Sequence, residues 1–349
     1  MLKSLGICAL VCFVCYCVNW FLTEQIEDAV VHLINLCGIA ILLAVSLNVI
    51  NGLAGQFSLG HAGFMSVGAY MSAYFTTNLS YFDEKAGQYV SETAMLSGTH
   101  GFLFSALAGA GAAALVGLLV GAPTLRLKGD YLAIVTLGVG EIIQIAITDM
   151  RKVGGATGLS GIPGLPSLPL IPEGIGTTAP FWIFSAVGLA ILACIRLQNS
   201  TYGRVLVAIR ENELAAELMG IRAVRLKVMA FVFGAFIAGL AGAIYARYQL
   251  SVRPADFSYV RSIEVVVMIV LGGLGSLSGA VVGAVTMTLL PEVLRPVEEG
   301  LGVTGIRMIV YSLVLILLML FRPQGLFGQR ELSLRLLRRL WPGSRKGGT

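Results

Sequence analysis

The chain has 349 residues and a formal net charge of +5, and 56% of its residues are hydrophobic whereas only 12% are charged. Soluble domains carry about 25% charged residues, so this chain cannot cover its surface with polar side chains. The composition excludes a secreted soluble domain and, despite the positive charge, a nucleic-acid-binding protein. The apolar runs lack the two-residue alternation of membrane strands, which excludes an outer-membrane barrel.

Long stretches without Asp, Glu, Lys or Arg indicate membrane spans. About 20 consecutive apolar residues cross the hydrocarbon core as a helix, so each stretch can hold at least one span. The stretches are residues 4–23, 29–82, 93–125, 174–195, 228–246 and 265–291. The sequence therefore predicts an all-α polytopic membrane protein with about eight to ten transmembrane helices.

The expected spans are 4–23, 29–50, 62–82, 101–121, 130–148, 179–196, 228–248 and 305–321. The first begins like a signal peptide but lacks a cleavage site, so it is expected to remain as a helix. Its cysteines are interpreted as small packing residues, and no metal site is predicted. The segment 262–294 must enter the membrane and return, either as a helical hairpin or as a re-entrant pair of half-helices.

The positive-inside rule orients these spans, because cytoplasmic loops carry an excess of Lys and Arg. With a cytoplasmic N-terminus, 16 of the 24 basic residues face the cytoplasm. Both termini are therefore expected in the cytoplasm. Residues 1–328 are expected to form a transmembrane domain that contains a cytoplasmic loop at 198–227, and residues 329–349 a basic cytoplasmic tail.

Clusters of small residues interrupt the apolar pattern in both halves of the chain. Three glycines lie within residues 51–61 and four within 272–279. Irregular backbone survives at membrane depth only where it is buried in protein or lines a cavity, and paired breaks are typical of transporters built from repeats. Whether the two halves of the chain form an internal repeat stays open from the sequence. Gly117 and Gly121, four residues apart, indicate close helix packing.

Polar side chains within or beside the spans are candidates for a translocation path. Glu141 lies about eleven residues, roughly 16 Å, into its span, where an ionisable group is by default a functional candidate. A hydrogen-bonding role between helices is the alternative for Glu141, and a solvated carboxylate is the alternative for Glu264. The candidate set is Asn48, Gln56, Ser58, His61, Glu141, Gln144, Glu264, Gly272 and Gly273.

The loop 198–227 is predicted to contain a short amphipathic helix. Acidic residues alternate there with Leu214, Ala215, Ala216 and Leu218, and Gly220 is placed to end the helix. A connector between two helices rarely needs about 30 residues. The loop is therefore interpreted as a docking element for a cytoplasmic partner.

Six runs of sequence together resemble one family. They are LNVINGLAGQFSLGHAGFMSVGAY (47–70), LRLKGDYLAIVTLGVGEII (125–143), GGATGLSGIPG (154–164), GRVLVAIRENELAAELMGI (203–221), SIEVVVMIVLGGLGSLSGAVVGA (262–284) and FRPQGLFG (321–328). Residues 30–328 resemble the LivM-type permeases of branched-chain amino acid ABC importers. Two positions depart from the general "EAA" loop of importer permeases, since Leu214 occupies the Glu position and Phe233 the proline position.

The resemblance implies a division of labour among subunits in a bacterial inner membrane. The sequence has no GxxxxGK[ST] phosphate loop, so the chain is expected to be no enzyme and to need no cofactor, with ATP hydrolysed by two cytoplasmic ATPase subunits. The other implied partners are a homologous second permease, an external solute-binding protein and membrane lipid, without nucleic acid. The implied coupling residues are Arg210, Glu211, Glu213, Ala215, Ala216 and Gly220.

Two other functions stay open from the sequence. A urea or short-amide ABC permease of the same superfamily would share many of these motifs. An ion-coupled secondary transporter would use the broken helices and Glu141 for proton or sodium coupling, although the docking loop argues against it.

Overall fold

The computed structural model describes residues 28–78, 80–83, 88–91, 98–127, 129–166 and 178–295, and separate positions between 298 and 326. The expected span 4–23 and the tail 329–349 lie outside the described residues, and the expected span 305–321 is described only at separate positions.

The described residues are mostly helical, as the sequence predicts. The α-helices are α2 (Asp28–Leu47), α3 (His61–Asn78), α4 (Gly98–Thr124), α5 (Asp130–Asp149), α6 (Ala179–Asn199), α7 (Thr201–Glu211), α8 (Glu213–Leu218), α9 (Ala223–Gln249), α10 (Tyr259–Gly272) and α11 (Leu277–Val293). The shorter helical turns are the π-helix η1 (Asn48–Leu53) and the 3₁₀ turns η3 (Arg151–Val153), η4 (Gly155–Thr157) and η5 (Pro254–Phe257). Two antiparallel pairs of strands complete the fold, β1 (Ser80–Asp83) with β2 (Gln88–Ser91) and β3 (Leu159–Ser160) with β4 (Ser251–Val252).

Five helices among the described residues are long and apolar enough to cross a membrane. They are Asp28–Leu53, Gly98–Thr124, Asp130–Asp149, Ala179–Asn199 and Ala223–Gln249. These five support the predicted polytopic membrane fold.

The structure describes how two other apolar segments fold. The segment 262–294 forms two packed helices, α10 and α11, of 14 and 17 residues. Both are shorter than a full span of about 20, so a hairpin of two spans and a re-entrant pair of half-helices both stay open. The expected span 62–82 is too long, because α3 ends at Asn78 and β1 begins at Ser80. The run Thr76–Asn78 favours an end there, since Thr and Asn have low helix propensity.

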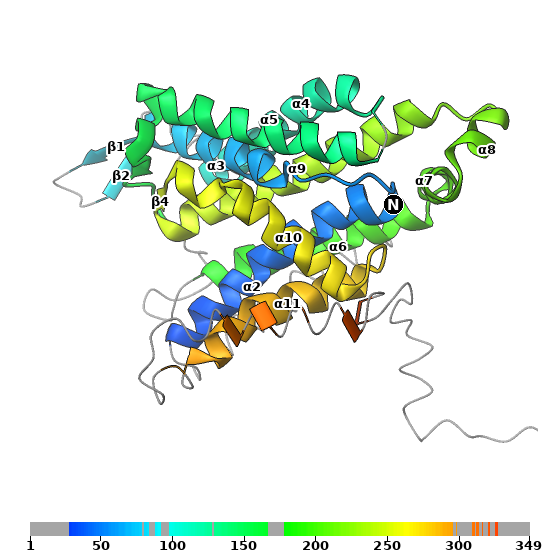
Figure 1. Ribbon diagram of the computed structural model, residues 1–349. Coiled ribbons are helices and arrows are strands. Elements are labelled where there is room, and N and C mark those ends of the chain that lie inside the picture. The colour runs from blue at the N-terminus through cyan, green and yellow to red at the C-terminus, as the bar shows by residue number, and fades with distance from the viewer. Residues whose placement is uncertain are drawn as a thin grey trace, which may run out of the picture.

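The helices form two groups (Figure 1), and one cluster of buried hydrophobic residues contains members of both. Helices α3, α4, α5 and α9 lie together on one side, and α2, α6, α10 and α11 on the other. The strands β1 and β2 lie at one end of the helices and α7 and α8 at the opposite end, which we call the docking end. Any partner of α7 and α8 therefore approaches from one end of the bundle.

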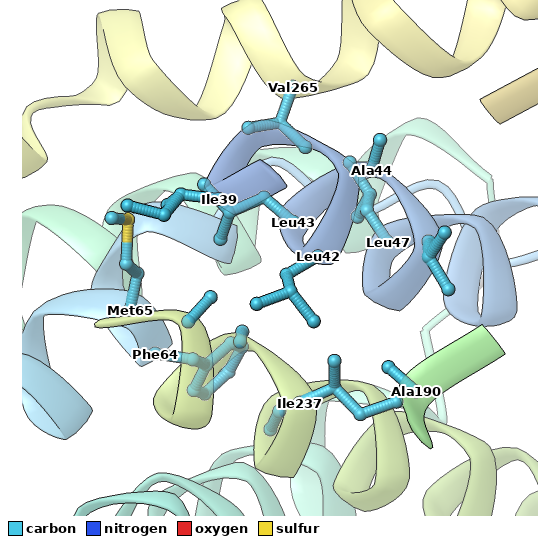
Figure 2. Packing of buried hydrophobic residues seen from close by; sticks show 14 of the residues in the cluster. Ile39, Leu42, Leu43, Ala44, Leu47, Phe64, Met65, Ala190, Ile237 and Val265 are labelled. Atoms are coloured by element: carbon cyan, nitrogen blue, oxygen red, sulfur yellow. The ribbon is translucent and has the colours of Figure 1, made fainter. Parts of the chain in front are cut away.

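Helix α2 lies at the centre of this core. Figure 2 shows its side chains meeting those of α3, α6, α9 and α10. The labelled residues are Ile39, Leu42, Leu43, Ala44, Leu47, Phe64, Met65, Ala190, Ile237 and Val265. Because α2 runs directly into η1, the first glycine-rich segment is anchored in the best-packed part of the molecule.

Small residues let α4 approach α9 closely. A Cβ atom on Gly117 would lie 2.6 Å from the Cβ of Ala235, and one on Gly121 would lie 3.0 Å from the ring of Phe231. Both separations are shorter than ordinary contacts between carbon atoms. The prediction that Gly117 and Gly121 mark close packing is therefore confirmed.

A buried arginine that the sequence analysis did not single out joins α3, α4 and α9 near β1 and β2. Nη2 of Arg247 donates to Oγ1 of Thr76 at 3.0 Å and to Oγ of Ser105 at 3.1 Å. Its guanidinium also lies 5.2 Å from the centre of the Phe102 ring, a cation–π contact. These contacts fix the three helices at the end opposite to α7 and α8.

Candidate functional site

The first break is the segment 48–60 between α2 and α3. Its helical part is the π-turn η1, in which the N–H of Ala54 donates to the carbonyl of Val49 at 3.1 Å. Residues 54–60 then have no regular secondary structure before α3 begins at His61. The helix thus continues to Leu53, three residues beyond the expected span, and breaks among the predicted glycines. π-Turns occur frequently at functional sites.

The second break is the turn 273–276 between α10 and α11, and it touches the first. The N–H of Gly275 donates to Oδ1 of Asn48 at 3.0 Å. A Cβ atom on Gly52 would lie 2.6 Å from the backbone nitrogen of Gly275. The two breaks, separated by more than 200 residues in the sequence, therefore meet backbone to backbone.

Arg210, at the end of α7, joins both breaks. Its Nη1 donates to the carbonyl of Gly52 at 2.8 Å, and a Cβ atom on Gly275 would lie 2.9 Å from the same nitrogen. Its Nη2 pairs with Oε1 of Glu211 at 2.7 Å. The family resemblance implies that Arg210 is a coupling residue, and in the structure its side chain points toward the two breaks. We call Asn48, Gly52, Arg210 and Gly275 the junction.

Four polar side chains of the first break and its end are buried with unpaired atoms. These atoms are Nδ2 of Asn51, both amide atoms of Gln56, Oγ of Ser58 and Nδ1 of His61, and none has a hydrogen-bond partner within the described chain. Leaving a buried polar group unpaired costs about 1–3 kcal/mol. These polar groups would therefore be stabilised in any state that admits water or a polar solute.

His61 contacts Ser46 through one ring nitrogen. Its Nε2 lies 2.7 Å from Oγ of Ser46, which also lies 2.8 Å from the carbonyl oxygen of Leu43. Its Nδ1 has no hydrogen-bond partner within the described chain. No group of three His, Cys, Asp or Glu residues in the described ranges could hold a metal ion.

The other path candidates lie outside this polar set. Oε1 of Glu141 accepts from the N–H of Tyr259 at 3.1 Å, and Nε2 of Gln144 donates to the carbonyl of Pro254 at 3.2 Å. A carboxylate is favourable at a helix N-terminus, so Glu141 holds the start of α10 against α5, and Gln144 holds η5 there. Glu264 is partly exposed and pairs with Arg261 at 2.9 Å.

The two path glycines lie at the end of α10. Gly272 packs against the backbone of Gly279 at the start of α11. Gly273 has φ +113°, a conformation that favours glycine, and its N–H donates to the carbonyl of Ile269 at 2.9 Å. These glycines shape the hairpin turn that carries Gly275 to the junction.

The predicted surface helix of the loop is in fact two helices. Oγ of Ser200 accepts from the N–H of Gly203 at 3.1 Å and caps α7. Oδ1 of Asn212 accepts from the N–H of Ala215 at 3.0 Å and caps α8. Asn is a strong N-cap residue, which explains why the continuous amphipathic pattern divides at Asn212.

Gly220 ends α8 as the sequence predicts. It has φ +83°, its N–H donates to the carbonyl of Glu217 at 2.9 Å, and the N–H of Ile221 donates to that of Ala216 at 3.2 Å. This pair of bonds is a Schellman motif, which requires the left-handed conformation that glycine adopts most easily. The turn directs the chain from α8 back into α9.

The outward face of α8 differs from the expected coupling set. Ala216 is buried with Ile209 and Ala223, and Glu213 pairs with Lys227 of α9 at 2.8 Å. Leu218 and Met219 are instead 89% and 83% exposed.

The surface that α8 presents outward therefore carries large apolar side chains beside the exposed Glu217. Leu214 is also exposed, and we call Leu214, Leu218 and Met219 the docking face. Exposed apolar groups beyond the spans mark contact surfaces. Two large apolar residues directly before a C′ glycine were the signal that sequence reasoning missed. Of the six expected coupling residues, Glu211 and Ala215 are exposed beside this face, and Gly220 ends the helix that carries it.

Comparison with known proteins gives one family for most of the chain. Residues 29–321 match the family described as "Branched-chain amino acid transport system / permease component". No solved structure gives a significant match.

Individual relatives agree with this family. The chain is 33% identical over 324 residues to the high-affinity branched-chain amino acid transport system permease protein LivM of Salmonella typhimurium, covering 85% of this chain and 70% of the relative. It is 32% identical over 338 residues to LivM of Escherichia coli K12, covering 89% and 73%. It is also 28% identical over 155 residues to the permease protein LivH of Salmonella typhimurium, covering 44% and 48%.

Proposed function

The chain belongs to the branched-chain amino acid transport system permease family, and on this premise we propose that it is the membrane-spanning subunit of an ATP-driven importer of branched-chain amino acids. One structural observation carries the mechanism. A helix pair that lies beyond the spans is tied through Arg210 to both glycine breaks. Force applied to α7 and α8 therefore reaches the interrupted helices directly.

The junction gives this transmission a physical route. Arg210 holds the carbonyl of Gly52, and Asn48 holds the N–H of Gly275. Hydrogen bonds to a charged donor are among the stronger ones, so α7, η1 and the 273–276 turn move together. Glu213 and Lys227 connect α8 to α9 in the same way. ATPase closure against the docking face would thus rock several helices as one unit.

The polar set offers a path for a zwitterion. An amino acid carries one positive and one negative group, and burying an unpaired charge is expensive. The amides of Asn51 and Gln56, the hydroxyl of Ser58 and the ring of His61 supply neutral donors and acceptors for both ends. Their unpaired atoms favour a cycle in which this region opens to solute and closes again.

The other subunits of the proposed importer perform the steps for which this chain has no motif. Without a phosphate loop, ATP is hydrolysed by two cytoplasmic ATPase subunits docked on α7 and α8, and the chain itself needs no cofactor. Similarity to both LivM and LivH supports a pair of related permeases around one path. An external solute-binding protein delivers the substrate at the β1–β2 end.

The orientation follows from charge and from the docking helices. Arg196, Arg204, Arg222 and Arg225 all lie in or beside α7 and α8, and basic residues concentrate on the cytoplasmic side. The docking end therefore faces the cytoplasm of a bacterial inner membrane, with both termini on that side.

The two alternative functions receive less support. A urea or short-amide permease gains nothing from the comparisons, in which the LivM relatives of three organisms are named for branched-chain amino acids. A proton-coupled carrier would need a carboxylate free to exchange its proton, whereas Glu141 is bonded to the backbone of α10.

Competition for uptake tests the proposed substrate class. Cells that depend on this chain for leucine uptake are expected to lose most labelled leucine uptake when excess isoleucine or valine is added. Excess urea or acetamide should leave uptake unchanged, because neither fills an apolar side-chain site or carries both charges. Inhibition by urea but not by valine would contradict the proposed substrate.

The docking face gives a second test of the proposal. The double variant Leu218→Ser and Met219→Ser is expected to reduce co-purification of the ATPase subunits at least about tenfold, because buried leucine-sized side chains each contribute about 1.5–3 kcal/mol. The control Leu250→Ser removes an exposed apolar side chain near the opposite end of α9 and should leave co-purification unchanged. Equal losses in both variants would argue against a docking face on α8.

A further inference from the structure

An apolar groove of about 480 Å³ lies between α4, α6, α7 and α9 at the docking end. Every lining side chain is apolar except for the hydroxyl of Tyr202. The residues that define its walls are Leu118, Leu197, Tyr202, Met229, Phe233 and Phe236. None of the mechanism above uses this groove.

The groove is about as long, along α9, as one membrane leaflet is thick. Its lining along α9 runs from Leu226 to Phe236, which is ten steps of about 1.5 Å, or about 15 Å of helix. Half of a hydrocarbon core is also about 15 Å. Tyr202, which is 57% exposed, also lines the groove, and aromatic residues with a polar tip are typical of the membrane interface.

Two arginines lie at the start of α9, beyond the groove. Arg225 precedes Met229, Phe233 and Phe236 at spacings of four, four and three residues, and such spacings place side chains on one helical face. Arg222 is the N-cap residue directly before α9. Both arginines are exposed, and neither forms an ion pair within the described ranges, unlike Arg210 and Lys227 nearby. The face therefore changes from apolar to cationic where the membrane surface is expected.

We propose that this groove binds one anionic phospholipid of the leaflet at the docking end. An acyl chain fills the groove between α4 and α9, and the phosphodiester lies between Arg222 and Arg225. Arginine binds phosphate oxygens in bidentate geometry, and basic clusters beside transmembrane helices are typical sites for anionic headgroups. Since α7 forms one wall, the lipid supports the docking helices from the membrane side.

Native mass spectrometry of the full-length, delipidated chain tests this directly. The chain is titrated with phosphatidylglycerol or phosphatidylcholine of identical acyl composition. The first phosphatidylglycerol is expected to bind about 25-fold more tightly, because each basic residue near an anionic surface contributes about a factor of five. The double variant Arg222→Gln and Arg225→Gln should abolish this preference, whereas Arg222→Lys with Arg225→Lys should retain most of it.

Matched variants separate a built site from general surface charge. Arg196→Gln with Arg204→Gln removes two other exposed arginines of the docking end and should leave the preference intact. Ala114→Trp fills the groove and should weaken the first binding of both lipids.

Three results would overturn the proposal. The first is equal binding of the two lipids by the unmodified chain, and the second is equal loss of preference in both arginine pairs. The third is loss of ATPase co-purification with unchanged lipid binding in Arg222→Gln with Arg225→Gln, which would assign these arginines to a protein partner. Lipid binding is measured without transport, so failure here leaves the proposed function standing.

Discussion

Replacing Arg210 with Gln is expected to abolish uptake while the ATPase subunits remain bound. The shorter amide cannot keep the 2.8 Å hydrogen bond from Nη1 to the carbonyl of Gly52. Movement of α7 would then no longer be transmitted to the two breaks. In reconstituted complexes, the number of ATP molecules hydrolysed per imported solute molecule should rise at least about tenfold, because losing a hydrogen bond to a charged group costs about 1.5–3 kcal/mol. Paired measurements of phosphate release and labelled leucine uptake give this ratio.

Two related variants define the control for Arg210. Glu211→Gln removes the ion pair at 2.7 Å but leaves the bond to Gly52, and it should keep a near-normal ratio. Arg210→Lys retains one charged donor and should restore part of the coupling. If Arg210→Gln instead lost the ATPase subunits, Arg210 would belong to the docking face and not to the junction.

Gly52→Ala is the second substitution with a large expected effect. The new Cβ would lie 2.6 Å from the nitrogen and 2.8 Å from the Cα of Gly275, and backbone atoms cannot move aside as a flexible side chain can. The breaks should separate, with uptake falling more than about tenfold. Overpacking of this kind costs about 1–3 kcal/mol of stability, which a thermal unfolding measurement on the purified protein detects.

Gly138→Ala provides the matched control in α5. A Cβ atom there meets nothing within 4 Å, and alanine is better in a helix than glycine by about 1 kcal/mol. Uptake should be unchanged and the unfolding temperature equal or slightly higher. Normal uptake in Gly52→Ala would show that the contact between the two breaks is dispensable.

Much of the fold could be predicted from where charges are absent. Uncharged stretches long enough for a bilayer located α2, α4, α6 and α9, because the cost of burying charge acts on each helix separately. Gly220 was equally predictable, since a helix end that needs a left-handed residue is a local requirement. Such features depend on neighbours within a few residues.

The junction could not be predicted, because it depends on how distant segments pack. The sequence places Asn48 and Gly275 in or beside the two glycine-rich breaks, but no pattern of neighbouring residues indicates that they contact each other. Ala216 illustrates the same limit on a helix surface. Alternation of small and charged residues marks two faces of α8 without saying which one meets Ile209 and Ala223, so the buried alanine was expected at the partner surface.

The position of Glu141 within α5 could be predicted from the sequence, but its hydrogen-bond partner could not. Its place near the middle of α5 follows from residue counting, and an ionisable group at that depth needs a partner. The partner is the first free N–H of α10, at Tyr259. That contact exists only after the α10–α11 hairpin has packed on α5, and no spacing within α5 specifies it.

Transport by the reconstituted complex tests the central claim most directly. Proteoliposomes containing this chain, its second permease, the ATPase subunits and the binding protein can receive ATP and a pH gradient separately. Leucine uptake is predicted only with ATP and all partners, and it should persist without a gradient and in Glu141→Gln. Uptake by this chain alone, driven by the gradient without ATP, would contradict the account.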